Sequence, residues 1–287
     1  MTLRRNRLFI LAGSTSLAAA GLFATPAHAA GDTATAELSG RDGRLNLFTY
    51  EGGDLRNQAE VVLSLSEDRS VYTYEVDDVV DIKAGTNCAH PDSADLTKVV
   101  CEIENVVGGT TSDWPSGQIS FGAGNDTVEF TNRTTTYFNA ISLDAGNDTY
   151  TGSPLRDAVV SGNEGTDTLN IGGGGEGHGD EGNDLITLVA GRAMASGGDG
   201  EDEIQGGVGG DSLHGGADDD VIYGNDGDDL IYGDQGNDFL YGGREHDEIY
   251  GNSGDDTIFG NSGNDTISGG PGTDTISGGT GSNTITN

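Results

Sequence analysis

Positive charge, cysteine and apolar residues are all scarce in this sequence of 287 residues. It has 13 Lys and Arg against 48 Asp and Glu, which gives a formal net charge of −35. Such a surplus of negative charge excludes nucleic acid and anionic membranes as natural partners, because both would be repelled, and it favours cations. Only 33% of the residues are hydrophobic, a composition typical of disorder unless the acids occupy fixed structural positions.

Motifs of common hydrolases are absent as well. No H-E-x-x-H occurs, which excludes a zinc protease of the common kind, and Gly251-Asn252-Ser253-Gly254 is not the G-x-S-x-G of a serine hydrolase. The histidines form no cluster in the sequence, and no helices are predicted that would flank an EF-hand loop. We therefore expect no enzyme, with an unrecognised hydrolase in residues 31–118 as the alternative.

Apolar runs long enough to cross a bilayer are absent after the first thirty residues. Those thirty residues contain the basic pair Arg4-Arg5, an apolar stretch over Leu8–Phe23 and small residues ending at Ala29. This order is typical of a secretory signal peptide, with a membrane anchor as the alternative. We predict that residues 1–29 are removed and that the mature protein is secreted, extracellular and without a membrane span. Whether export is Sec or Tat stays open.

The cysteines number only two, Cys88 and Cys101. In an exported protein an even pair predicts a disulfide. A metal site on these two is not expected, because zinc needs further ligands and the nearby His90 stands alone.

The segment around the cysteines, residues 30–118, has more Lys and Arg than the rest and several alternating runs. The runs typical of strands are residues 44–50, 59–66, 71–76 and 98–103. We interpret this segment as a small β unit that caps the N-terminal end of the glycine-rich region downstream, because a bare end would expose unpaired strand edges.

Glycine, by contrast, is abundant, with 50 residues, and it recurs with an acid at fixed spacing. From Gly197 to Thr286 the sequence divides into ten blocks of nine. Position one is always glycine, position six is Asp in nine blocks, and position eight is always Ile or Leu. The core of the motif also recurs upstream, at Asp126, Asp148, Asp167 and Asp184. We therefore predict irregular coils over residues 119–196 and a regular repeat over 197–287.

The nine-residue unit has the residues for a turn followed by a short strand. Six residues are turn material, with glycines that permit positive φ, and three can form a strand whose position-eight aliphatic faces inward. Two units make one coil of eighteen residues. Stacked coils then give two parallel sheets, fed alternately by successive blocks, around a ladder of aliphatic side chains. The predicted fold is all-β, a parallel β-roll.

That interior is too thin to stabilise the fold alone. Each block buries one aliphatic side chain, which contributes about 2 kcal/mol, whereas ordering each of nine residues costs about 1 kcal/mol or more. Aspartates eighteen residues apart lie on neighbouring coils about 4.8 Å apart and would repel each other. A hard dication between them turns repulsion into attraction, and calcium fits best because it accepts carboxylate and carbonyl oxygens in flexible geometry.

The repeat resembles the RTX, or hemolysin-type, calcium-binding motif G-G-x-G-x-D-x-U-x, which Gly197–Gln205 matches at every fixed position. The resemblance implies a β-roll that folds on binding extracellular calcium. The side-chain ligands it implies are Asp184, Asp202, Asp211, Asp220, Asp229, Asp238, Asp247, Asp256, Asp265 and Asp274. The carbonyl ligands it implies are Gly198, Gly200, Gly207, Gly209, Gly216, Gly227, Gly236, Gly254, Gly263 and Gly272. The segment from Cys88 to Asp126 also looks like the start of small secreted actinobacterial members.

Some positions depart from this pattern. Glu245 replaces a glycine that should need positive φ, and Arg244 adds a positive charge beside it, so the sites bordering block 242–250 are in doubt. Asn283 replaces the last aspartate, and a weak last site is expected there.

Aromatic residues recur at position nine, in Tyr223, Tyr232, Tyr241, Tyr250 and Phe259. One interpretation is a ladder of outward rings that stabilises the sheets. The other is an adhesin or interaction module, with an exposed strip that binds a glycan or protein while calcium is purely structural. The C-terminal edge at 285–287 is also a candidate for edge-to-edge self-association.

Overall fold

The computed structural model describes residues 33–39, 47–53, 56–67, 69, 71–104, 116–134 and 139–286. The secondary-structure elements in these ranges are all β-strands. The predicted signal segment, residues 1–29, lies outside the described residues. No helix in the described ranges is long and apolar enough to cross a membrane.

Seven strands form the N-terminal region. They are β1 (Ala34–Ser39), β2 (Leu47–Glu51), β3 (Gln58–Leu65), β4 (Val71–Asp77), β5 (Ile82–Ala84), β6 (Cys88–Ala89) and β7 (Lys98–Glu104). β2, β3, β4 and β7 overlap the four runs predicted from alternation, of which residues 44–46 lie outside the described residues. β1, β5 and β6 were not predicted. The predicted disulfide is confirmed, and it joins Cys88 in β6 to Cys101 in β7.

The remaining nineteen strands form the roll. Eight lie in the irregular coils: β8 (Ser116–Ser120), β9 (Thr127–Asn132), β10 (Asn139–Ser142), β11 (Thr149–Thr151), β12 (Val159–Glu164), β13 (Thr168–Ile171), β14 (Glu176–Glu181) and β15 (Leu185–Leu188). Eleven follow: β16 (Met194–Asp199), β17 (Glu203–Val208), β18 (Ser212–Ala217), β19 (Val221–Asp226), β20 (Leu230–Gln235), β21 (Phe239–Arg244), β22 (Glu248–Ser253), β23 (Thr257–Ser262), β24 (Thr266–Ser268), β25 (Thr275–Ser277) and β26 (Thr284–Thr286).

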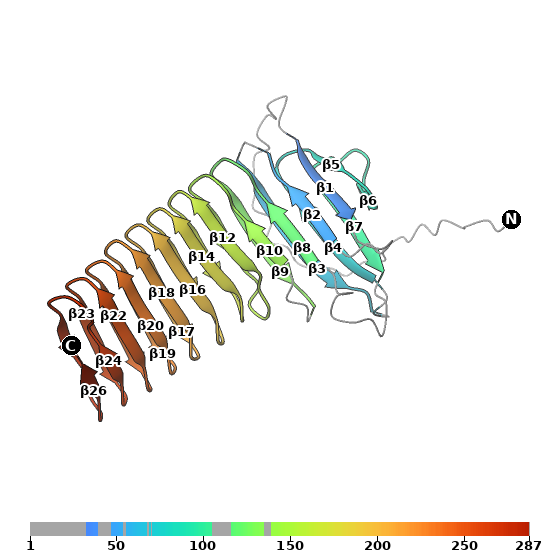
Figure 1. Ribbon diagram of the computed structural model, residues 1–287. Helices are drawn as coiled ribbons and strands as arrows, with labels where there is room; N and C mark the ends of the chain where they lie inside the picture. Colours follow the sequence, from blue (N-terminus) through green and yellow to red (C-terminus); the bar gives the residue numbers. More distant parts are fainter. Residues whose placement is uncertain are drawn as a thin grey trace, which may run out of the picture.

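The strands of the roll alternate between two sheets, as the eighteen-residue coil predicts. From β8 onward the even-numbered strands lie in one 13-stranded sheet and the odd-numbered strands in the other (Figure 1). Neighbours in each sheet are parallel, and Leu213 pairs with Ile231 as Ile231 pairs with Ile249. The fold is therefore a parallel β-roll, and its regular coils keep the core residues in strict register.

The N-terminal strands continue both sheets. β2 pairs in parallel with β8, and β3 with β9, while β1–β2, β3–β4 and β4–β7 are antiparallel pairs. β1, β2, β4 and β7 thus lie at the end of the roll opposite to β26 (Figure 1). The roll is closed at this end by a change from parallel coils to antiparallel hairpins.

Most strands of the regular repeat are longer than the sequence predicted. β19, β20 and β21 each have six residues, which occupy positions seven to nine of one block and one to three of the next. The prediction of three-residue strands holds for β24, β25 and β26 and was wrong for the strands before them. There pairing to the next coil continues through positions two and three, as in Asn225 with Gly243 and Asp226 with Arg244. The turn is therefore confined to positions four to six.

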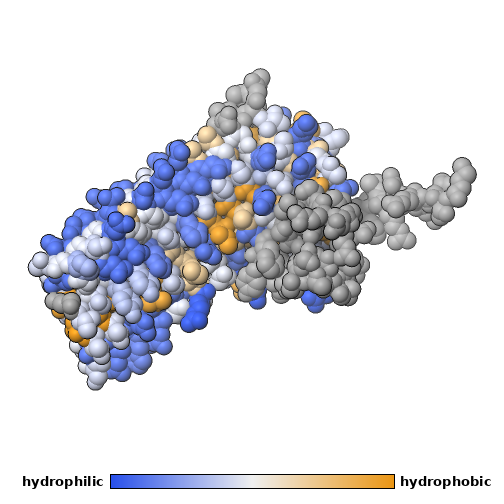
Figure 2. Space-filling view, in the orientation of Figure 1, coloured by the Kyte–Doolittle hydropathy of each residue, from blue (hydrophilic) through white to orange (hydrophobic). Residues whose placement is uncertain are grey.

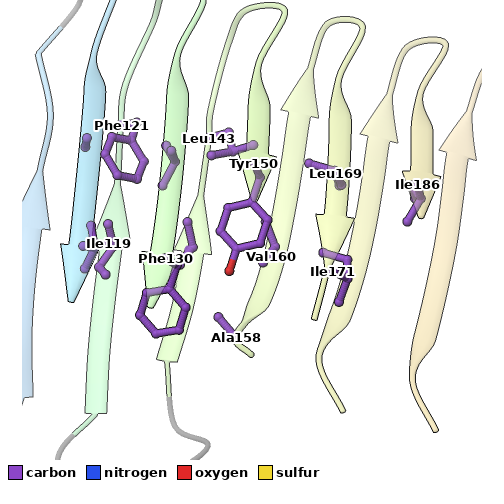
Figure 3. Packing of buried hydrophobic residues seen from close by; sticks show 14 of the residues in the cluster. Ile119, Phe121, Phe130, Leu143, Tyr150, Ala158, Val160, Leu169, Ile171 and Ile186 are labelled. Carbon is purple, nitrogen blue, oxygen red and sulfur yellow. The ribbon is translucent and has the colours of Figure 1, made fainter. Parts of the chain in front are cut away.

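The core changes along the roll. Large rings such as Phe121, Phe130 and Tyr150 fill the space between the sheets near β8–β11, and single aliphatic side chains such as Leu169 and Ile186 follow (Figure 3). In the regular repeats the position-eight aliphatic is fully buried from Ile204 to Ile267, as predicted. The regular part of the roll therefore has one large apolar side chain per strand in its interior.

Candidate metal sites

The position-six aspartates lie in two rows, one along each edge of the roll where the chain turns from one sheet to the other. The odd edge, which leads into odd-numbered strands, carries Asp126, Asp148, Asp167, Asp184, Asp202, Asp220, Asp238, Asp256 and Asp274. The even edge carries Asp211, Asp229, Asp247 and Asp265, followed by Asn283. The structure therefore places the ten predicted aspartate ligands in these two rows, together with three more upstream.

One oxygen of each carboxylate belongs to a ladder of hydrogen bonds between coils. The backbone NH of Asp184 donates to Oδ1 of Asp202 at 2.7 Å, and the NH of Asp202 donates to Oδ1 of Asp220 at 2.8 Å. On the even edge the NH of Asp211 donates to Oδ1 of Asp229 at 2.8 Å. These bonds fix each carboxylate against the preceding coil.

The other oxygen, Oδ2, is buried and has no hydrogen-bond partner among the described residues. This holds for twelve aspartates: Asp126, Asp148, Asp167, Asp184, Asp202, Asp211, Asp220, Asp229, Asp238, Asp247, Asp256 and Asp265. A buried charged oxygen without a partner is costly, and twelve in two rows cannot be explained as a local exception. Each such oxygen needs a proton or a cation.

Oδ2 packs directly against the position-one residue, which must therefore be glycine. A Cβ added to Gly197 would lie 2.0 Å from Oδ2 of Asp202 and 2.6 Å from the carbonyl oxygen of Gly215 in the next coil. At Gly233 the same two distances are 2.2 Å to Asp238 Oδ2 and 2.8 Å to Gly251 O. A carboxylate oxygen and a carbonyl oxygen thus both pack against the same position-one residue, at a distance that leaves no room for a Cβ. Two negatively polarised oxygens brought together in this way suit a hard cation.

The glycines predicted as carbonyl ligands occupy positions two and four. Many of their carbonyl oxygens pack against the residue at the same position in the next coil. A Cβ added to Gly216 would lie 2.0 Å from the carbonyl oxygen of Gly198, and a Cβ added to Gly227 would lie 2.2 Å from that of Gly209. The carbonyl that the structure brings next to Oδ2 is that of position one, as in Gly215, which was not predicted from the sequence. The constant glycine in the first column is the signal that would have identified it.

Burial changes the acidity of these carboxyl groups. Loss of solvent raises the pKa of Asp202 and Asp247 to about 7 and that of Asp220 to about 8. The backbone hydrogen bond to each carboxylate lowers its pKa, whereas neighbouring carboxylates raise it further. The pKa of Asp229 and Asp238 rises to about 6 for the same first reason. Keeping these groups ionised at neutral pH is therefore unfavourable without a positive charge nearby.

A second hydrogen-bonded ladder follows position five, a column that varies in the sequence and was not predicted to have a role. The NH of Asn237 donates to Oδ1 of Asp219 at 2.7 Å, and the NH of Asp255 donates to Oδ1 of Asn237 at 2.9 Å. On the even edge the NH of Asn264 donates to Nδ1 of His246 at 3.0 Å. Short polar acceptors in this column hold the turns together, with the side chain accepting from the following coil.

The departures from the repeat leave its geometry in place. Glu245 has φ 70° and Asp218, in the corresponding position, has φ 78°, so both take the left-handed conformation of the glycine they replace. Asp247 keeps its partnerless Oδ2, 2.4 Å from the place of a Cβ on Gly242. At the C-terminal end, by contrast, Nδ2 of Asn283 lies 2.6 Å from the place of a Cβ on Gly278. An amide nitrogen thus replaces the carboxylate oxygen.

The position-nine aromatics form two ladders rather than one strip. Tyr223, Tyr241 and Phe259 stack on the odd-strand sheet with ring centroids 4.9 and 5.2 Å apart. Tyr232 and Tyr250 stack on the other sheet at 5.1 Å. That ladder also includes His214, 4.6 Å from Tyr232, which was not predicted because its ring is neither Tyr nor Phe. All six rings are half-buried.

No group of three or more His, Cys, Asp or Glu side chains that could hold a metal occurs in the part of the chain that the structure describes. Nine aspartates of the two rows instead combine one carboxylate oxygen with a backbone carbonyl at a position-one glycine, an arrangement distinct from a site made of clustered side chains.

Comparison with known families gives one match. The family model described as RTX calcium-binding nonapeptide repeat (4 copies) matches residues 196–231, 214–249 and 250–285. Together these matches cover the ten blocks of the regular repeat and leave the irregular coils and the N-terminal region unmatched. No curated protein matches the chain.

Proposed function

Because residues 196–285 are RTX calcium-binding nonapeptide repeats, we propose that the protein is a secreted, non-enzymatic calcium-binding β-roll. Calcium bound between successive coils drives the folding of the repeats. The observation that carries the proposal is the pair of rows of twelve buried Oδ2 atoms without a protein partner among the described residues, nine of which pack with a carbonyl oxygen against a position-one glycine. Calcium supplies the positive charge that these oxygens lack.

The role of calcium in folding is supported by the composition of the interior. One aliphatic side chain per strand contributes little stability, while twelve buried carboxylates oppose folding when they are ionised. Binding energy from ions that only the folded coils can hold becomes folding energy. The repeats are thus expected to order where calcium is plentiful, outside the cell, in agreement with the predicted signal peptide.

The aromatic ladders favour structural stacking over recognition of a glycan. Their rings are nearly parallel, with interplanar angles of 9° to 15°, and each inner ring covers its faces with the rings before and after it. Sugars stack on the open face of an aromatic ring, and these ladders offer edges instead. The adhesin alternative therefore has no specific support from the arrangement of these side chains.

The proposal is tested by removing one ligand from the row and one acid outside it. Asp229→Asn keeps the Oδ1 acceptor and removes the charge, whereas Asp199→Asn changes an exposed acid at position three. We expect Asp229→Asn to bind fewer calcium ions or to bind them at least tenfold more weakly, measured by calorimetric titration, and Asp199→Asn to bind like the wild type. Equal losses in the two variants would refute the assignment of the row.

A further inference from the structure

The even edge in the middle of the roll has a surface unlike the rest of the molecule. Five of the eight large hydrophobic side chains that are exposed among the described residues lie there, with exposed fractions from 39% to 82%. They belong to four neighbouring coils, whose strands β12, β14, β16 and β18 pair in that order (Figure 1). Exposed apolar side chains that are gathered in this way mark a surface for a partner. This apolar patch consists of Leu155, Val159, Val189, Met194 and Val208.

The turns beside the apolar patch carry no exposed acid, in a chain with a formal net charge of −35. The turns that lead into β12, β14, β16 and β18 contain two acids, Asp157 and Asp211, and both are buried. They also contain two cationic residues, Arg156 and Arg192. Repulsion between two such acidic molecules is therefore weakest at the patch. On the odd edge of the same coils, by contrast, the exposed acids include Glu164, Glu181, Asp199, Glu201, Asp218 and Asp219.

A hollow lies within the apolar patch. The turn into β14 consists of four glycines, Gly172–Gly175, so no side chain stands between the turn of Leu155 and that of Val189. The first of these glycines cannot be larger, because a Cβ on it would lie 1.8 Å from the carbonyl oxygen of Ser153. The hollow has a volume of about 340 Å³ and combines apolar walls with charges of both signs. Its lining includes Val159, Gly174, Gly175, Glu176, Arg192 and Met194.

The two charges in the hollow lie on neighbouring coils. Nε of Arg192 donates to the carbonyl oxygen of Gly210 at 3.1 Å, and its guanidinium forms no salt bridge within the described ranges. Glu176 begins β14, and its Oε1 lies 3.0 Å from Nε2 of His178. A guanidinium pairs most strongly with a carboxylate, often through two hydrogen bonds. A partner that brings a carboxylate to Arg192 and a cation to Glu176 is therefore bound in one orientation.

A second copy of the chain supplies both, because the apolar patch contains the complement of each of its own features. We propose that two copies associate through this patch in antiparallel orientation. A two-fold axis that crosses the edge between the coils of β14 and β16 sets the first coil of the patch against the partner's fourth and the second against the partner's third. Leu155 then meets the partner's Val208, and Val189 enters the glycine turn of the partner subunit. Arg192 pairs with the partner's Glu176.

The association is measured by sedimentation equilibrium of the full chain over a range of protein concentrations. Calcium is present so that the repeats are ordered, and the readout is the molecular mass alone. Leu155→Asp places an acid in the apolar patch at a side chain that is 82% exposed, so the fold of the single chain does not depend on it. Leu96→Asp is the matched control, because Leu96 is also exposed, at 44%, and lies in the N-terminal region. The ion pair is tested by Arg192→Glu, by Glu176→Arg and by the two changes together.

We expect a concentration-dependent dimer for the wild type and for Leu96→Asp, and a dissociation constant roughly tenfold higher in Leu155→Asp. Arg192→Glu and Glu176→Arg should each weaken the dimer, and the combined variant should restore it, because the ion pair is rebuilt with its charges exchanged. A wild type that stays monomeric at every concentration would overturn a second copy as the partner. A dimer that Leu155→Asp leaves unchanged, or that Leu96→Asp weakens equally, would overturn the patch as the interface. Failure of the combined variant to recover would overturn the antiparallel arrangement.

Discussion

The N-terminal region and the C-terminal repeats belong to the same two sheets, yet their interiors differ in kind. The N-terminal region buries large rings, with Phe48 and Tyr74 stacked at 4.3 Å, and has a disulfide. The repeats bury one aliphatic per strand and two rows of carboxylates, and Figure 2 shows mostly hydrophilic surface over their visible face. A solenoid can thus exchange an apolar interior for an ionic one while its strands stay in register.

The irregular coils mark the transition between these two regions. Tyr150 is buried and donates to Oδ1 of Asp157, whose Oδ2 accepts the NH of Gly172 at 2.6 Å. This aspartate is therefore satisfied by protein donors, unlike Asp167 a few residues later. The middle of the roll thus contains both a buried carboxylate that accepts from a hydroxyl group and one whose Oδ2 has no partner among the described residues.

Removal of calcium should have the largest effect, because it should unfold the repeats while the N-terminal region stays folded. Each ion site at a free calcium concentration 100 times its Kd adds about 2.7 kcal/mol, so loss of several sites exceeds the stability of the repeats. In calcium-free protein we expect fast amide exchange in β17–β26 and continued protection in β3, β4 and β7. Hydrogen exchange with mass spectrometry measures both regions in one sample. Equal protection of the two with and without calcium would contradict the comparison.

Acid should partly replace calcium in the repeats. Several of their buried carboxyls, such as Asp202, Asp220 and Asp229, have pKa values of about 6 to 8 when folded, against 3.8 for the free group, so the folded state binds more protons between about pH 4 and pH 8. The stability of calcium-free repeats is therefore greatest at acid pH and decreases as pH rises through 6 to 8.

Circular dichroism of calcium-free protein, prepared by chelation and gel filtration, should show more β signal at pH 5 than at pH 8. The same repeat signal at both values would show that the carboxylates are not what opposes folding.

Substitution of a ring in the aromatic ladders should have the smallest effect on the stability of the repeats. Tyr241→Ser removes two ring contacts, with Tyr223 and Phe259, and cross-strand pairs contribute roughly 0.2 to 1 kcal/mol each. We expect the thermal midpoint of the calcium-loaded repeats to fall by a few degrees, with the calcium count unchanged. Thermal unfolding followed by circular dichroism measures the shift. A change in the number of bound ions would instead couple the ladder to the metal rows.

The nine-residue period predicted most of the roll because each column of the sequence corresponds to one place in the coil. It identified the inward aliphatic, the aspartate rows and the alternation of blocks between sheets. It did not predict the six-residue strands or the carbonyl of position one, because pairing between coils is not visible in one unit. β1 was missed since small residues such as Ala34 and Ala36 carry little hydrophobic pattern, although both are fully buried. β5 was missed because its three residues are too few to show an alternation.

The register of the regular coils makes the length of the molecule adjustable in steps of eighteen residues. Each coil touches only its two neighbours, so inserting a complete pair of blocks would change contacts only at the insertion point and keep every other block on its present sheet. Inserting a single block would exchange the sheets for everything downstream, and would set the ladder of Tyr232 and Tyr250 on the face where Tyr223 now begins its own. Duplication of an even number of blocks therefore preserves the sheet to which each downstream strand belongs, whereas duplication of an odd number exchanges the two sheets.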